Sequence, residues 1–341
     1  MTDRSDGAHP ERARQETQDT CAGDKAVPQR PAGAFFRRPL DVHEVMDALC
    51  AMRGSAPEDD DPEPLALEGV SDSRNGGERL LLFCTAKSGP TCADIRHSLV
   101  LTDALPEAHA TDTNRYCIVP DPRAAYIDAL SWAISAVGID PFRPGFTKNA
   151  TISDDAVIAP SAVIEPGVEV GPGTVIEAGA VVKSGTRIGA CTTIRENTVI
   201  GTDGINIYRA LDGRALRFPH VGGVCIGDRT EIGAHTVVAG GMLSPTVIGD
   251  DVIIGNLCNI GHGVLVGNGV WMSVGCLVGG HASLSGGATL AMGVRVRDNL
   301  CIGENASLGM GSVIVKDVGS GHSMFGNPAK RMVGLRTGPK R

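Results

Sequence analysis

The stretch IGDDVIIGNLCNIGHGVLVG, residues 248–267, shows the repeat that decides the fold, because an aliphatic residue stands at every sixth position. The same spacing continues to Ile314 and also holds from Ile152 to Ile200 and from Ile226 to Val238. A period of six fits neither a helix nor an ordinary strand, whose periods are 3.6 and 2. A fixed repeat of this length indicates a solenoid. We therefore expect each hexad to form a short flat wall, three walls to close a triangular coil, and about eight coils to stack.

The composition agrees with a narrow aliphatic core, since 42% of the residues are hydrophobic but only 4% are aromatic. The net charge of −8 and the lack of a basic stripe disfavour a nucleic-acid partner. None of the ten cysteines forms a C-x-x-C pair, so we expect reduced packing residues and no metal site. No apolar run reaches membrane-spanning length and the N-terminus does not resemble a signal peptide, which predicts a cytoplasmic protein without a membrane span.

The chain divides into four segments by composition and pattern. The first segment is polar and contains several Pro and Gly residues, which predicts disorder. The second combines strand-like runs with helical patterns at 42–52 and 123–137, which predicts a small α/β domain. The predicted segments are a disordered N-terminus at 1–34, a small α/β domain at 35–143, a β-helix at 144–318, and a C-terminal tail at 319–341.

The repeat is interrupted twice, by a long loop at 201–223 and by a four-residue slip near 242–247. A loop expelled from a rigid scaffold commonly carries a functional site. The alternative for the loop is a tolerated insertion. The slip is too short to bind a ligand alone, and we expect it to form a corner bulge beside the site.

A histidine and a glycine of the repeat have the spacing of a minimal acyl-transfer site. Gly280 follows His262 by eighteen residues, one complete coil, so the two should lie one above the other. A neutral imidazole can take the proton of an attacking amine or hydroxyl. A backbone N–H without a side chain can stabilise the oxyanion that forms. His262 is therefore the candidate base and Gly280 the candidate oxyanion donor, with His281 beside them as a substrate contact; the alternative is a pair of surface histidines.

Four segments of the chain carry a resemblance to a known family. Residues 200–204, 218–227, 248–256 and 260–262 resemble UDP-3-O-acylglucosamine N-acyltransferase of lipid A biosynthesis. The front domain resembles the uridine-binding domain of that family more weakly, at 69–72, 80–83 and 119–125. The resemblance implies a left-handed parallel β-helix that assembles as a homotrimer with active sites between subunits. It also implies that His262 is the base and that Gly280 donates to the oxyanion.

Further residues are expected to bind the substrates. The 201–223 loop, with Asp203 and His220, would shape the acceptor site together with Asn256 and, in the front domain, Phe83. The acyl arm would lie along the coil between subunits, near Met272, Leu277, Met292 and Met310.

The tail differs from that family. Residues 325–330 read FGNPAK and resemble the end of coenzyme-A-dependent sugar acetyltransferases, where this segment closes over the cofactor. Lys330 and Arg331 would then bind the phosphates of the donor, since Lys and Arg suit phosphate. No permanently bound cofactor and no metal are expected; acyl-CoA or an acyl-phosphopantetheine carrier would be the co-substrate.

These patterns predict an acyltransferase that moves an acyl group from a thioester, on coenzyme A or an acyl carrier protein, to an amine or hydroxyl of a sugar-like acceptor. One alternative is an acetyl-CoA-dependent sugar O- or N-acetyltransferase, which the tail favours. The other is a non-catalytic β-helix scaffold. Gly263 and Asn299 point toward it, because the resembled family has Asn and His at those places.

Overall fold

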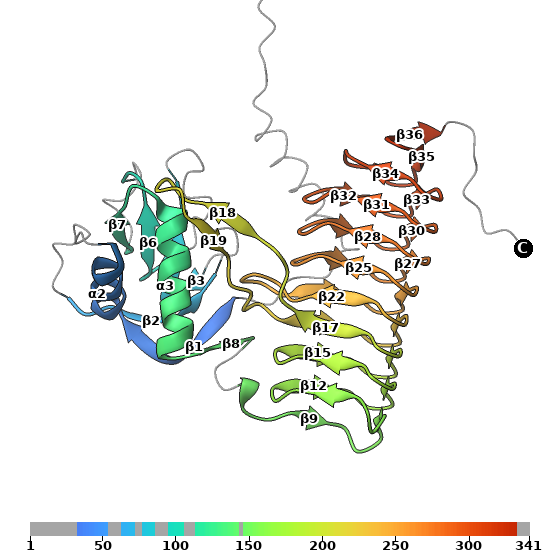
Figure 1. The fold of residues 1–341 in the computed structure, drawn as a ribbon, viewed down its shortest axis with the longest axis horizontal. Coiled ribbons are helices and arrows are strands. Elements are labelled where there is room, and N and C mark those ends of the chain that lie inside the picture. Colours follow the sequence, from blue (N-terminus) through green and yellow to red (C-terminus); the bar gives the residue numbers. More distant parts are fainter. Residues whose placement is uncertain are drawn as a thin grey trace, which may run out of the picture.

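The computed structural model describes residues 33–53, 63–71, 77–85, 95–105, 113–142 and 146–332. It shows a mixed α/β part followed by a long stack of coils, with the α/β part beside the coils (Figure 1). The prediction of disorder for residues 1–34 falls, except for the last two residues, outside the described part of the chain.

The α/β part is built on one six-stranded sheet, ordered β7-β6-β4-β2-β1-β8. The strands β2, β4, β6 and β7 run parallel in succession, whereas β1 pairs antiparallel with both β2 and β8. Both helices lie at the helical patterns of the sequence, the strand-like runs correspond to β4, β6 and β7, and the other strands of this part are additional. The elements are β1 (Ala34–Asp41), α2 (Val42–Arg53), β2 (Ala66–Val70), β4 (Leu80–Phe83), β6 (Leu99–Thr102), β7 (Arg115–Ile118), α3 (Pro122–Ala136) and β8 (Ile139–Pro141), beside the small pair β3 (Gly77–Glu78) and β5 (Ile95–Arg96).

The coils begin after a short 3₁₀ turn, η2 (Phe146–Lys148), and form three parallel walls. The first wall contains β9 (Thr151–Ile152), β12 (Val168–Val170), β15 (Thr186–Ile188), β20 (Val224–Ile226), β23 (Thr246–Ile248), β26 (Leu265–Val266), β29 (Ser283–Leu284) and β32 (Cys301–Ile302). The second contains β10 (Val157–Ile158), β13 (Val175–Ile176), β16 (Thr193–Ile194), β21 (Glu231–Ile232), β24 (Ile253–Ile254), β27 (Trp271–Met272), β30 (Thr289–Leu290) and β33 (Ser307–Leu308). The third contains β11 (Val163–Ile164), β14 (Val181–Val182), β17 (Val199–Thr202), β22 (Val237–Ala239), β25 (Asn259–Ile260), β28 (Leu277–Val278), β31 (Arg295–Val296) and β34 (Val313–Ile314).

The predicted fold class, mainly β with a parallel β-helix of hexads and a small N-terminal α/β part, is confirmed. The first and third walls have eight strands each, which gives eight coils. Uninterrupted neighbours pair with a shift of eighteen residues, as Ile260 does with Val278. The aliphatic residue of each hexad points inward and is buried from Val170 onward, while Ile152 at the open end of the stack stays 41% exposed. The stack ends in a hairpin, β35 (Ser323–Gly326) and β36 (Ala329–Met332), which extends the second wall.

Both interruptions of the repeat leave the stack at the same corner, between the third and first walls. The loop connects β17 to β20 and contains the antiparallel hairpin β18 (Ile207–Arg209) and β19 (Ala215–Arg217). The slip connects β22 to β23 one coil later. The hairpin lies beside α3 (Figure 1), and Phe218 and Leu243 are buried in the hydrophobic core of the α/β part. The loop and the slip therefore join the coils to the α/β part.

Candidate active site

The corner where the loop and the slip emerge also carries the two residues of the predicted site. His262 follows β25 and Gly280 follows β28, the next strand of the third wall, so the register places one above the other. A Cβ atom built on Gly280 would lie 2.7 Å from both Cε1 and Nε2 of His262. Only a glycine lets the imidazole approach this backbone so closely. The stacking that the eighteen-residue spacing predicts is confirmed.

Two further histidines flank His262. The ring of His281 lies edge-on with a centroid distance of 4.8 Å, and its backbone N–H donates to the His262 carbonyl at 2.9 Å. The ring of His220, on the loop, lies 5.3 Å from His262 in the same edge-on arrangement. Gly204, near the start of the loop, closes the group, because a Cβ there would lie 2.9 Å from His220 Nε2 and from His262 Cδ2.

Burial favours the neutral form of two imidazoles of this group, His220 and His262. Burial lowers the pKa of His220 to about 4, with a further contribution from the charge of a protonated His262. Burial also lowers the pKa of His262, partly opposed by the carboxylate of Asp298 two coils further along. Neither ring nitrogen of His220, nor Nδ1 of His262, has a hydrogen-bond partner of good geometry among the described residues. An unprotonated imidazole is the form that acts as a general base.

The amide of Gly280 is the second functional group. It donates no hydrogen bond to any residue in the described part of the chain. Asp298, which stands above Gly280 at the same hexad position, instead accepts from Asn299 Nδ2 at 2.7 Å. The Gly280 N–H therefore remains available beside His262.

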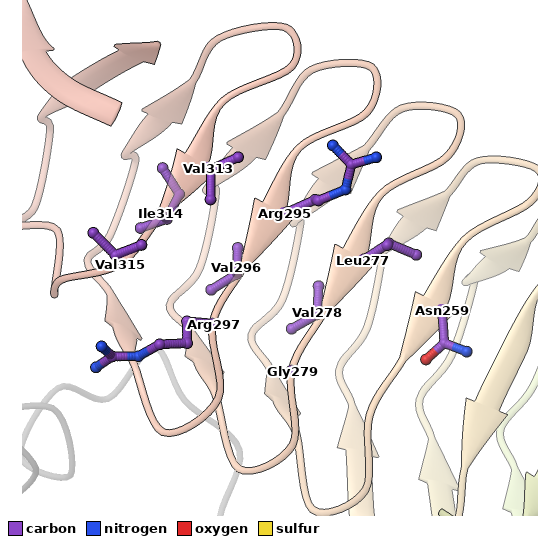
Figure 2. A pocket seen from close by; sticks show the side chains of 10 residues that line it. All are labelled: Asn259, Leu277, Val278, Gly279, Arg295, Val296, Arg297, Val313, Ile314 and Val315. Atoms are coloured by element: carbon purple, nitrogen blue, oxygen red, sulfur yellow. The ribbon is translucent and has the colours of Figure 1, made fainter. Parts of the chain in front are cut away.

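A groove of about 560 Å³ runs along the third wall and reaches Gly279, one residue before the free amide. Figure 2 shows the side chains of Leu277 and Val313 along it, with those of Arg295 and Arg297 extending to opposite sides. Neither guanidinium has an ion-pair partner among the described residues. The full lining is Asn259, Leu277, Val278, Gly279, Arg295, Val296, Arg297, Val313, Ile314 and Val315.

The structure does not bring every predicted residue to this corner. Asn256, Met292 and Met310 lie at the corner between the second and third walls, one wall away from His262 in the same chain. Met272 is fully buried in the coil core, so the expectation that it borders the acyl arm is wrong. The side chains of Lys330 and Arg331 are exposed on β36, at the end of the second wall.

The remaining predicted residues belong to the loop and to the α/β part. Asp203 is exposed and lies 3.8 Å from Arg217 across the loop. Phe83 contacts Tyr126, with ring centroids 4.8 Å apart, and Tyr126 in turn contacts Phe218 at 5.9 Å. Phe83 is therefore connected through two rings to the segment that holds His220.

Four residues of the site are not predicted from the sequence: Gly204, Asp298 and the two groove arginines. Asp298 follows His262 by two coils, so counting hexads could have found it. Gly204 and the arginines cannot be found by counting. The contact of Gly204 with His220 and His262, and the lack of an ion-pair partner for the arginines among the described residues, both depend on the tertiary structure.

Among the described residues there is no group of three or more His, Cys, Asp or Glu side chains that could hold a metal ion. No helix in the described ranges is long and apolar enough to cross a membrane. None of the cysteines in the described part of the chain forms a disulfide.

Comparisons with known proteins support the resemblance. Residues 149–184 match the family model of the bacterial transferase hexapeptide (six repeats). A UDP-3-O-acylglucosamine N-acyltransferase of Pseudoalteromonas translucida is 42% identical over 76 residues. That match spans 22% of this chain and 22% of the relative, about a fifth of its length.

Solved structures of UDP-N-acetylglucosamine acyltransferases are also similar. The enzyme of Francisella novicida is 26% identical, with a TM-score of 0.42 over 51% of this chain and 64% of that one. The enzyme of Moraxella catarrhalis is 28% identical, with a TM-score of 0.39 over 55% of this chain and 74% of that one. The family model and the sequence relative together confirm that this chain resembles the hexapeptide-repeat acyltransferases, as its hexads predict.

Proposed function

We propose that this protein transfers an acyl group from a phosphopantetheine thioester to an amine or hydroxyl of a sugar-like acceptor. The donor would be acyl-CoA or an acyl carrier protein. The observation that carries the proposal is the contact between the His262 ring and Gly280, whose amide makes no hydrogen bond within the described residues. The sequence relative, named for N-acyl transfer to UDP-3-O-acylglucosamine, supports the same reaction class.

In this reaction the acceptor amine or hydroxyl attacks the thioester carbonyl while neutral His262 takes its proton. The carbonyl oxygen becomes an oxyanion, which the Gly280 N–H stabilises. When the tetrahedral intermediate collapses, the C–S bond breaks and the imidazolium returns its proton to the leaving thiolate. The lowered pKa of His262 keeps the ring unprotonated before the attack.

The groove on the third wall suits the donor, because it combines apolar side chains with two guanidinium groups. Neighbouring parallel strands lie about 4.8 Å apart, so Arg297, two coils beyond His262, stands about 10 Å further along the stack. A pantetheine arm in the groove would bring its phosphate to this region. Lys330 and Arg331, on the second wall, offer the alternative phosphate site that the tail predicts.

A charge reversal at each pair separates these two donor sites. We expect Arg295→Glu with Arg297→Glu to raise the KM for the thioester donor at least about tenfold at low salt, and less at high salt because screening weakens exposed charges. Lys330→Glu with Arg331→Glu is the matched variant. A larger rise of the donor KM in the Lys330/Arg331 variant would instead assign the donor phosphate to the second wall.

A homotrimer would complete the site. Several apolar side chains are exposed on the second wall and at its corner with the third, namely Ile253, Leu257, Trp271, Val274, Met292 and Met310. Burial of such side chains favours association. A threefold arrangement would bring Asn256, Met292 and Met310 of one subunit toward the His262 corner of the next.

The decisive experiment compares two histidines of the coil. We expect His262→Asn to lower the rate of acyl transfer by about 10²–10⁴-fold, the usual contribution of a general base, with unchanged thermal stability. His235→Asn is the control, since His235 is exposed on the coil and its positive φ of 56° suits asparagine. The assay pairs acyl-CoA and acyl-carrier donors with amino and hydroxy sugars, and equal rates in the two variants would reject His262 as the base.

A further inference from the structure

The loop that carries His220 is attached to the α/β part more firmly than to the coils. We call residues 204–222 the strap. Its hairpin meets the buried carboxylate of Asp121, the residue that caps the N-terminus of α3. Asp121 Oδ1 accepts from the Tyr208 hydroxyl at 3.0 Å, and Oδ2 accepts from the Leu211 backbone N–H at 2.9 Å.

Further contacts between α3 and the strap surround this carboxylate. Arg123 donates to the side-chain oxygen of Asn206 at 3.1 Å, and its guanidinium lies 4.9 Å from the centre of the Tyr208 ring. Arg214 forms an ion pair with Asp128 at 3.1 Å, one turn and a half further along α3. The hairpin is thus held along one side of the helix.

The end of the strap is anchored in the same way. Phe218 is 1% exposed and packs against Tyr126 of α3. Two residues later the chain places His220 against His262, and the Val221 N–H then donates to the Met242 carbonyl at 2.7 Å. Because the ring nitrogens of His220 have no partner of good geometry in the described structure, the anchors on both sides of this residue determine where its ring lies.

The position of His220 matters for His262, since the His220 ring and Gly204 cover one side of the candidate base. We propose that Asp121 is a positioning residue, which acts through the strap to hold His220 over His262 and keep water away from that imidazole. The α/β part then contributes to the site a function other than binding a substrate. Only the kinetic consequence of this proposal rests on the proposed function.

Other charged and titratable groups also face the two rings. His262 faces His281 on the next coil and Asp298 two coils away, in addition to His220 on the strap. His220 faces Asp203 and Arg217 of the loop. Asp121 meets the strap at Tyr208 and Leu211, so a change at Asp121 reaches His262 through the position of the strap.

The test measures the pKa of His262 directly, by nuclear magnetic resonance of protein labelled at the histidine Cε1 atoms and assigned with His262→Asn. In Asp121→Asn and, to a smaller extent, in Tyr208→Phe, we expect this pKa to rise toward that of a free imidazole, because water reaches the ring. His220→Ala should reproduce the rise. Arg209→Gln is the control, since Arg209 lies on the same hairpin, is exposed and has its side-chain hydrogen bond within the hairpin.

Kinetics give the second measurement. We expect Asp121→Asn to lower kcat about tenfold while KM stays within about twofold, since a small misplacement near the reacting groups reduces rate more than binding. If Asp121→Asn lowers the melting temperature too far for this comparison, Tyr208→Phe, which removes a single hydroxyl, replaces it. An unchanged pKa of His262 in the folded strap variants would overturn the proposal, and so would an equal rise in Arg209→Gln. If the pKa rises but acyl transfer does not depend on His262, the positioning role stands and the proposed role of His262 as the base fails.

Discussion

The same hexad position has different roles at two corners of the coil. At the corner between the first and second walls, three successive amides at this position donate to a side chain of the next coil. Ala190 donates to Asp228 at 2.7 Å, Asp228 to Asp250 at 2.8 Å, and Asp250 to Asn268 at 3.0 Å. At the corner between the third and first walls the equivalent residues are His262, Gly280 and Asp298, and no such bond caps the Gly280 amide.

The difference shows how a repeat scaffold yields a site. A buried or half-buried amide that lacks a partner costs free energy, and at the corner between the first and second walls three successive coils supply an acceptor one step above. Asp298 accepts from Asn299 and not from Gly280, so the Gly280 amide remains a donor for a ligand. Asn256 belongs to the capping set, since its side chain accepts from the Ala234 amide at 2.9 Å at the corner between the second and third walls.

Among variants of these two corners, the largest effect is expected from filling the open corner. Gly280→Ala should lower acyl transfer by about 10²–10³-fold, similar to the loss of one oxyanion donor, because the new Cβ displaces the His262 ring. The measurement is kcat/KM with thermal stability as a check on folding. Gly240→Ala is the matched control at the same corner, where the nearest atom to a new Cβ is an ordinary 3.5 Å away. Comparable losses in both variants would show that any side chain at this corner disrupts it.

Removing a cap from the other corner should affect stability instead. Asp228→Ala leaves the Ala190 amide without its acceptor, and we expect the free energy of unfolding to fall by about 1–2 kcal/mol with unchanged turnover. Asp154→Ala is the control, since Asp154 occupies the same position in the first coil and has no coil before it to cap. A loss of turnover in Asp228→Ala would mean that the two corners are not independent.

The smallest expected effect comes from an attempt to cap the open corner. Asn299→Gly removes the side chain that diverts Asp298, and glycine suits the positive φ of 57° at this residue. We expect the freed carboxylate to turn toward the Gly280 amide and turnover to fall about threefold, since the oxyanion donor is then occupied. Asn305→Gly, with a φ of 54° at the equivalent position of another corner, is the control. Turnover at the wild-type level in Asn299→Gly, measured beside this control, would show that Asp298 does not compete for the amide.

The sequence alone determines the coils, because the core of a solenoid is one inward residue per hexad. The register of Ile260 with Val278, the eight coils and the contact between His262 and Gly280 all follow from counting. The same count places Asn256 at the corner between the second and third walls, one wall away from His262. There its side chain caps the Ala234 amide of its own chain. The resemblance to an acyltransferase rests on residues of the repeat and of the loop at 201–223, and it is confirmed.

The tertiary structure decides what reaches the corner from outside the repeat. The hydrogen bond between Asp121 and Tyr208 joins residues 87 positions apart, and no periodicity relates them. The same is true of the His220 ring beside His262, since the conformation of the loop depends on Phe218 burying itself in the core of the α/β part. A repeat determines local geometry one coil at a time, whereas a strap between two parts is determined only when both are folded and packed together.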